Sequence, residues 1–287
     1  YILHFTSEQD IVNSNTTVSR SFRGKTIGTI VNTLLNDYIY SEKPRNDLVI
    51  EKTVGIENIV ISNWKPFKAI NWLAKRAINE NGIPNYLFWE SNGITYFKSV
   101  ESLLTQEVKQ KFIFSPIIAS EQKIAQLSKG RIQLDSLEIV NQFNTIRNSE
   151  NGLYASKLIT HDIVKKKIQQ HTFGLERAYD DKVTHTDKYM PISPLDTYYT
   201  VQDRFTFAPQ GDGNNRGDNI QSYYDSKVMF HPKHNQMYAL NSNDLYDNYV
   251  EDWKLKRNAL ILGLDQIKLQ ITFSGISYLS VGHTVNI

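Results

Sequence analysis

The sequence predicts an α+β protein, and three patterns in its 287 residues carry this prediction. Residues 26–39 and 66–78 repeat apolar side chains at the spacing of an amphipathic helix. Residues 86–98 have the alternation of a β-hairpin around a central Asn92-Gly93, which supplies the positive φ angles of a tight turn. Apolar and polar residues alternate strictly at 266–273, which predicts a half-buried strand.

Residues 22–105 are expected to form a compact unit. The first helix buries one stripe and ends before Lys43-Pro44. After an extended stretch at 48–60, Pro66 opens the second helix, and Gly82 supplies a left-handed residue at its end. The hairpin and a short helix at 99–104 follow. The first stripe consists of Ile27, Ile30, Val31, Leu34, Leu35 and Tyr38.

The second half of the chain is less regular. Strands are predicted at 131–140 and 153–168, joined by a polar segment in which Gly152 is a break. Residues 179–243 are rich in Asp, Asn, Tyr, Gly and Pro, and predict a loop-rich insertion. A helix at 244–263 and the strand at 266–273 come next. Gly275 turns the chain into a last strand at 279–287.

Composition excludes several classes of protein. The 32 Lys and Arg against 30 Asp and Glu give a net charge of +2, unlike the clearly basic proteins that coat nucleic acid. The chain has no Cys, which excludes disulfide scaffolds, thiolate zinc sites, iron–sulfur clusters and Cys nucleophiles. No apolar run approaches about 18 residues, so no membrane span is expected. Both ends have strand-like patterns, which predicts a segment of a longer polypeptide.

Two motifs suggest ligand sites, and each has a simpler interpretation. Gly24-Lys25-Thr26 begins a helix, but Ser19 stands where a phosphate-binding loop needs its first glycine. His231 and His234 are three residues apart, and zinc would need two more ligands. Four of the other histidines have no supporting spacing, so loop or surface positions are expected; they are His161, His171, His185 and His283.

Acidic and basic clusters are also expected to be structural. Asp212–Asp218 resembles a calcium loop in composition, but Tyr223 replaces the bidentate Glu and Arg216 adds positive charge. The carboxylate pairs Asp180-Asp181 and Glu251-Asp252 are expected on solvated faces. Lys165–Lys167, beside Arg147 and Lys157, lacks interleaved aromatic residues and is expected at a charged strand edge. We therefore expect no catalytic, cofactor-binding or metal-binding residues, and no enzyme.

One ordered set of segments resembles a known family. The set begins with Ser19–Thr26 and its helix, Asn63–Phe67 with Trp72–Ala77, and the hairpin with the following Lys98–Leu103. It continues with Gly152–Leu158 and Asp162, Trp253–Arg257 and Val281-Gly282. In this order the segments resemble baseplate hub proteins of contractile-tailed bacteriophages. The resemblance spans most of the chain and is weakest at about 179–243.

The resemblance implies a fold with β-barrel tube-like domains, an interposed α/β domain and a loop-rich insertion in the second barrel. Mapped onto this chain, residues 1–21 would end the first barrel and 22–115 would be the α/β domain. Residues 130–178 plus 250–287 would build an incomplete second barrel, and 179–249 would be the inserted domain.

The resemblance also implies a structural virion protein in the phage tail baseplate, assembled in the host cytoplasm. Three copies would form a ring that joins the hexameric tail tube to the trimeric central spike. The implied partners are the tail tube protein, the spike protein, the tape-measure protein and other baseplate proteins, and DNA would pass through the lumen without specific binding. No cofactor or metal is implied.

Three other functions remain open at this stage. The chain could be the hub or spike segment of a type VI secretion machine or of a phage-tail-like bacteriocin, which share the fold and differ in their partners. A tail-associated cell-wall hydrolase acting through Asp, Glu or His residues belongs to a different class. An adhesin is suggested by the Tyr- and Asn-rich insertion alone.

Overall fold

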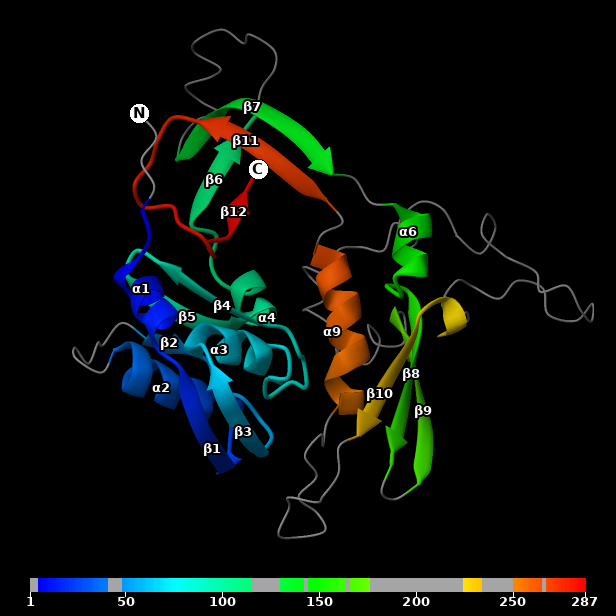
Figure 1. Ribbon diagram of the computed structural model, residues 1–287. Coiled ribbons are helices and arrows are strands. Elements are labelled where there is room, and N and C mark those ends of the chain that lie inside the picture. The colour runs from blue at the N-terminus through cyan, green and yellow to red at the C-terminus, as the bar shows by residue number, and fades with distance from the viewer. Residues whose placement is uncertain are drawn as a thin grey trace, which may run out of the picture.

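A computed structural model describes residues 5–40, 48–114, 130–141, 144–163, 166–175, 224–233, 250–264 and 267–287 (Figure 1). These residues form a mixed α+β fold whose strands are ordered β1-β3, β2-β5-β4, β11-β7-β6-β12 and β10-β8-β9. The helical elements are α1 (Glu8–Asn15), α2 (Ile27–Leu34), the π-helical η1 (Leu35–Ile39), α3 (Pro66–Ala74), α4 (Val100–Leu104), α6 (Thr145–Glu150), the 3-10 turn η3 (Tyr224–Ser226) and α9 (Val250–Leu264). The strands are β1 (Val18–Lys25), β2 (Leu48–Ile50), β3 (Glu57–Trp64), β4 (Tyr86–Ser91), β5 (Ile94–Ser99), β6 (Gln110–Ile113), β7 (Arg131–Asn141), β8 (Ala155–Asp162), β9 (Lys167–Gly174), β10 (Val228–Lys233), β11 (Lys268–Phe273) and β12 (Val285–Asn286).

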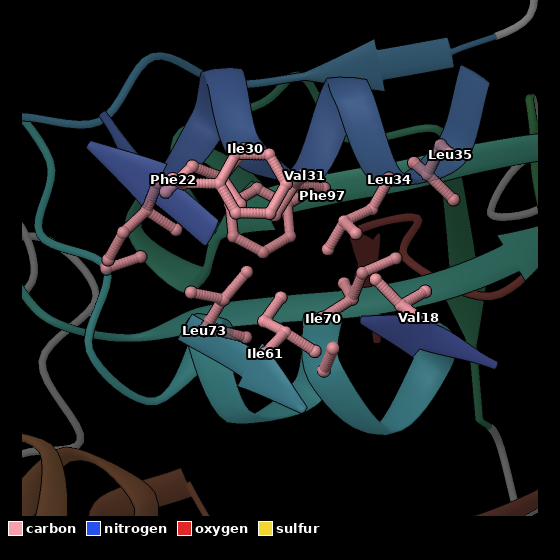
Figure 2. Close-up of a cluster of buried hydrophobic side chains, with 14 of the residues drawn as sticks. Val18, Phe22, Ile30, Val31, Leu34, Leu35, Ile61, Ile70, Leu73 and Phe97 are labelled. Atoms are coloured by element: carbon pink, nitrogen blue, oxygen red, sulfur yellow. The ribbon is translucent and has the colours of Figure 1, made fainter. Parts of the chain in front are cut away.

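The first helix forms where its apolar spacing predicts. Thr26 caps α2, and its side-chain oxygen accepts a hydrogen bond from the Thr29 amide. The helix continues as the π-helical turn η1, in which the Tyr40 amide donates to the Leu35 carbonyl at 2.9 Å. Figure 2 shows its stripe in a core shared with β1, β3, α3 and β5; the labelled side chains are Val18, Phe22, Ile30, Val31, Leu34, Leu35, Ile61, Ile70, Leu73 and Phe97.

The second helix is shorter than predicted. α3 begins at Pro66 and ends at Ala74, although Ala77 and Ile78 are buried as expected. Gly82 has a φ of 78°, but it closes a later turn in which its amide donates to the Asn79 carbonyl. The buried Asn79 side chain accepts from the Asn81 and Ile83 amides, so it organises this turn in place of further helix.

The predicted hairpin is confirmed. β4 and β5 pair antiparallel, and Asn92 and Gly93 have φ angles of 52° and 75° in the turn between them. β2 adds to β5 in parallel, which confirms extended chain before the second helix. Ser99 caps α4, the short helix expected after the hairpin.

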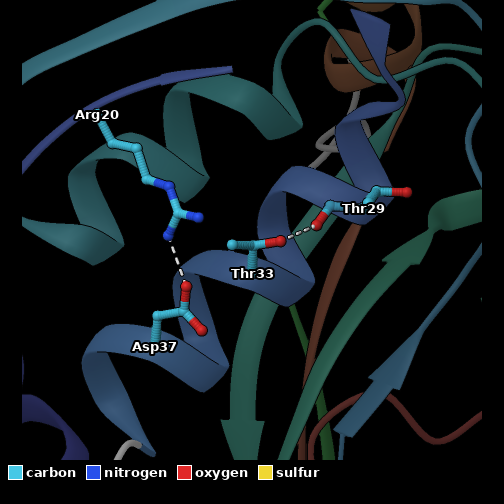
Figure 3. A network of polar contacts seen from close by, with 4 residues as sticks. All are labelled: Arg20, Thr29, Thr33 and Asp37. Carbon is cyan, nitrogen blue, oxygen red and sulfur yellow. Dashed lines mark hydrogen bonds and ion pairs between the residues drawn. The ribbon is translucent and has the colours of Figure 1, made fainter. Parts of the chain in front are cut away.

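The expected boundary between residues 21 and 22 falls inside β1. β1 pairs antiparallel with β3, and both Val18 and Phe22 lie in the core of the α/β unit. Arg20 of β1 also contacts Asp37 of η1 at 2.5 Å (Figure 3). Both side chains are almost half exposed, so this ion pair adds little stability.

β11, β7, β6 and β12 form a sheet that curls into half a barrel (Figure 1). The rings of Phe112 on β6 and Phe273 on β11 lie 4.8 Å apart although β7 separates their strands. The sheet therefore curls toward the face that carries these rings. β6 belongs to this sheet, although the resemblance placed it in the α/β domain.

The strand at 266–273 is confirmed, but its predicted burial is wrong for one end. Phe273 is half-buried, whereas Leu269 and Ile267 are 44% and 60% exposed. The alternation therefore gave the two faces correctly, but it could not say what covers them.

Two other strand predictions need correction. Residues 153–168 form not one strand but β8 and β9, joined by a turn in which Lys166 has a φ of 53°. The last predicted strand is reduced to β12, because Gly282 has a φ of 92° and packs against Trp89. α6 was not predicted; the Asn144 side chain caps it by accepting from the Arg147 amide.

β8 lies between β9, which is antiparallel to it, and β10, which is parallel to it. β10 lies in the range expected to be an insertion, and residues 179–223 and 234–249 lie outside the described part. α9 packs on one face of this sheet and confirms the C-terminal part of the predicted helix. The core between them consists of Leu153, Tyr154, Leu158, Phe173, Leu175, Leu255 and Ala259.

α9 also contacts the α/β unit. Its Arg257 donates to the carbonyl oxygens of Ala74 and Tyr86 at 3.4 Å and to the Asn85 side chain at 3.5 Å. Burial lowers the pKa of Arg257 to about 10, which still leaves the guanidinium charged at neutral pH. The Arg76 guanidinium lies 4.0 Å from the Trp72 ring and 5.9 Å from the Trp253 ring of α9.

Replacing Arg257 tests this connection. We expect Arg257→Ala to lower the free energy of unfolding by about 1–3 kcal/mol, because buried acceptors lose a charged donor. Lys256→Ala on the same helix is the control and should change it by no more than about 0.5 kcal/mol. Urea unfolding measures both, and equal losses would contradict the role assigned to Arg257.

Candidate assembly surfaces

At Gly24-Lys25-Thr26, the segment that suggested a phosphate site, nearby protein side chains accept the backbone hydrogen bonds. The Gly24 amide donates to Asn58 Oδ1 at 2.9 Å, and Thr26 accepts from the Thr29 amide. Lys25 ends β1 and is exposed. These two backbone donors are therefore already satisfied within the protein.

Three of the described histidines lie on strands and not in loops, namely His161 on β8, His171 on β9 and His231 on β10, whereas His283 lies outside the strands as expected. His231 of β10 faces α9, where its Nδ1 lies 3.1 Å from Lys254 Nζ. His161 lies on the opposite face of the same sheet, against the Phe230 ring. His283 Nδ1 accepts from the Ser280 amide, and His185 and His234 lie outside the described residues. In the part of the chain that the structure describes, no group of three or more His, Asp or Glu residues could hold a metal ion.

Glu251 is not on a solvated face. Lys233 of β10 reaches it across the sheet–helix boundary, with nitrogen–oxygen distances of 2.9 and 3.1 Å. The Lys233 side chain is only 13% exposed and that of Glu251 is 32% exposed. This ion pair joins β10 to α9. The pair Asp180-Asp181 and the loop Asp212–Asp218 lie outside the described residues.

The basic run lies at a hairpin tip. Lys166 is in the turn after β8 and Lys167 begins β9; both are exposed, and Lys165 lies outside the described residues. Lys157 pairs with Asp225. The positive charge is therefore concentrated at one end of the β10-β8-β9 sheet and not spread along a strand edge.

The α/β unit has two adjacent polar hollows. They have volumes of about 560 and 510 Å³ and share Glu51, Lys52 and Glu80. Glu51 accepts hydrogen bonds from the Ser99 amide and hydroxyl at 2.7 and 2.8 Å, and Glu101 accepts from Asn79 and Asn81. Burial and nearby Glu51 raise the pKa of Tyr86, so its phenol stays protonated and donates to the Lys52 carbonyl. Glu51 and Glu101 therefore hold the local structure together.

One face of the β10-β8-β9 sheet carries exposed apolar side chains. The β10-β8-β9 sheet packs on α9 with one side, while its other side, which we call the outer face, has Phe230, Val228, Ile168 and Ile163 at 48–63% exposure. Ile159 lies between them in the register. Sequence alternation at 228–233 could have revealed this strand, but Pro232 and the surrounding polar segments favour a loop.

The half-barrel also carries exposed apolar side chains. On the curled side of the sheet, Ile139 of β7 stands opposite Leu269 of β11, and these residues are 54% and 44% exposed. Ile267 continues the same side at 60%. We call Ile139, Leu269 and Ile267 the half-barrel face. It lies at the end of the curled sheet farthest from the buried Phe112 and Leu134.

Comparisons with known proteins give no family for the chain: no protein-family model matches it, and no curated protein does. Within the described residues, no helix is long and apolar enough to cross a membrane.

Removing one partner of the Lys233–Glu251 pair tests its structural role. We expect Glu251→Gln to lower the free energy of unfolding by about 1–3 kcal/mol, because it leaves a mostly buried ammonium without its carboxylate. The double variant Lys233→Met/Glu251→Leu should recover most of the loss. Unfolding in urea measures both proteins, and an unchanged Glu251→Gln variant would contradict this role.

Proposed function

We propose that this protein is a structural component of a phage tail baseplate, a hub whose three copies form a ring between the hexameric tail tube and the trimeric central spike. The observation that carries the proposal is the ordered set of segments that resembles the hub family. The curled half-barrel beside a compact α/β unit is consistent with that resemblance. In this proposal the half-barrel is part of a tube-like barrel in the ring wall.

The proposed mechanism is binding geometry and not chemistry. Open strand edges and apolar faces would be covered by neighbouring copies, by the tube protein and by the spike. A permanent ring of this kind should bury well over about 2,000 Å² at each interface. The tape-measure protein and DNA would pass through the lumen, and the weak net charge of +2 suits passage without retention.

A hub or spike segment of a type VI secretion machine or phage-tail-like bacteriocin is the nearest alternative, because it would share the ring and differ in its partners. A cell-wall hydrolase is less well supported. Glu251 is engaged by Lys233, and His231 by Lys254, in contacts that join α9 to its sheet.

The ring predicts a defined mass. We expect light scattering on the protein at micromolar concentration, alone or mixed with its spike, to give three copies per particle. A mass that stays at one copy under both conditions would contradict the proposal.

The enzyme alternative has its own test. We expect no clearing in a zymogram on peptidoglycan, because Glu51, Glu101, Glu251 and His231 serve structural contacts. Clearing that is lost in Asp180→Asn or His231→Ala, with the protein still folded by circular dichroism, would replace the hub proposal with the hydrolase.

A further inference from the structure

The dipeptide Asn-Gly occurs three times in the chain, and the structure places the three copies in different surroundings. They are Asn81-Gly82, Asn92-Gly93 and Asn151-Gly152. We infer that Asn92 is a modification site, at which the side-chain amide is converted into a carboxylate by reaction with the chain itself and with water. This inference goes beyond the proposed ring and does not depend on it, because it follows from the local chemistry of one turn.

The reaction at Asn92 needs no reagent other than water. The Gly93 backbone nitrogen attacks the Asn92 side-chain carbonyl carbon, so a new carbon–nitrogen bond forms and the bond to the side-chain nitrogen breaks. The proton of the Gly93 amide leaves with that nitrogen as ammonia. Water then opens the cyclic imide at either carbonyl and gives aspartate or isoaspartate, and nothing is oxidised or reduced. Glycine hinders this attack least because it has no Cβ.

The surroundings of Asn92 permit the ring closure. Asn92 and Gly93 form the tip of the β4-β5 hairpin, where both are exposed and Ser91 pairs with Ile94 behind them. Within the described part of the chain, the Asn92 side chain makes no hydrogen bond. The attack requires the Gly93 nitrogen to turn toward the Asn92 side chain, so the turn has to open briefly. Opening an exposed loop tip costs little free energy, because few contacts are lost.

Asn81 is anchored in a network that must break before its ring can close. Its Nδ2 donates to Glu101 Oε1 and its amide donates to Asn79 Oδ1, both at 3.0 Å. The Gly82 amide donates to the Asn79 carbonyl, also at 3.0 Å. Asn79 is itself buried and accepts from the Ile83 amide. The Asn81 side chain and its turn are therefore fixed together.

Asn151 is anchored in another way, at the end of α6. Its Nδ2 and its amide both donate to the Arg147 carbonyl, at 2.8 and 3.0 Å. Its own carbonyl accepts from Asn258 of α9 at 2.9 Å. The same dipeptide is thus held in place at 81 and at 151, and only the copy at 92 lies at a hairpin tip.

Isoaspartate at position 92 changes the hairpin as well as its charge. It lengthens the main chain within a two-residue turn, whose length sets the register of β4 against β5. β5 carries Phe97 of the core, so conversion reaches the packing of the α/β unit. Aspartate, the other product, keeps the length of the turn and adds only a negative charge.

Peptide mapping by mass spectrometry tests the inference on the full chain incubated at mildly alkaline pH. We expect the acid to form at Asn92 at least about tenfold faster than at Asn81 or Asn151, since one further hydrogen bond lost on opening accounts for about that ratio. The rate should rise with pH, because the attacking nitrogen must lose its proton. In concentrated urea the three copies should react at comparable rates, since the dipeptide is the same.

A matched pair of variants tests the anchoring. Glu101→Ala removes the acceptor of the Asn81 side chain, and we expect it to speed conversion at Asn81 while Asn151, still anchored, stays slow. Glu107→Ala changes an exposed carboxylate a few residues away and should leave all three rates unchanged.

The outcomes decide the inference without reference to assembly. Equal rates at the three copies in the folded protein contradict it, and so does an Asn92 that reacts in urea and is protected in the folded chain. An Asn81 that stays slow in folded Glu101→Ala contradicts the anchoring that separates the copies. A protein that forms no ring and still converts at Asn92 contradicts the proposed function and keeps this inference.

Discussion

Burial of α9 between two units is the constraint on which the rest of the structure depends. On one side, Leu255 and Ala259 pack into the β10-β8-β9 sheet. On the other, Arg257 enters the α/β unit and donates to backbone carbonyls around Tyr86. A guanidinium in such a place is costly to desolvate, and its depressed pKa records that cost. The hydrogen bonds that offset it are directional, so they fix the orientation of the helix as well as its position.

This constraint has a consequence for assembly. The outer face lies on the side of its sheet away from α9, and the half-barrel face follows α9 directly in the chain, through β11. Because α9 is held on two sides, the outer face keeps a defined orientation relative to the α/β unit. A ring needs such rigidity, since the rotation between neighbouring copies must repeat without drift to close. Burial of hydrophobic area would supply the free energy of association. The fixed geometry would determine how many copies close the ring.

Sequence patterns predicted local structure well where a single element decides it. The α2 stripe and the Asn92-Gly93 turn followed directly from helical spacing and from the φ angles that a tight hairpin requires. Patterns failed where tertiary contacts decide. After Ala74, the Asn79 side chain organises a turn where the sequence predicted further helix. Near the C-terminus, the predicted strand is interrupted at Gly282, which packs on Trp89. The outer face was missed because β10 pairs with β8, a strand far away in the sequence. The alternation of β11 predicted which residues share a face, but not which elements cover that face.

The central claim is that this chain forms a three-fold ring between tube and spike, and imaging the assembled particle tests it most directly. Electron microscopy of particles carrying a tag on this protein should place three copies in one closed ring, at the junction where six-fold symmetry changes to three-fold. Label elsewhere on the particle, or absence of the protein from the particle, would contradict the account.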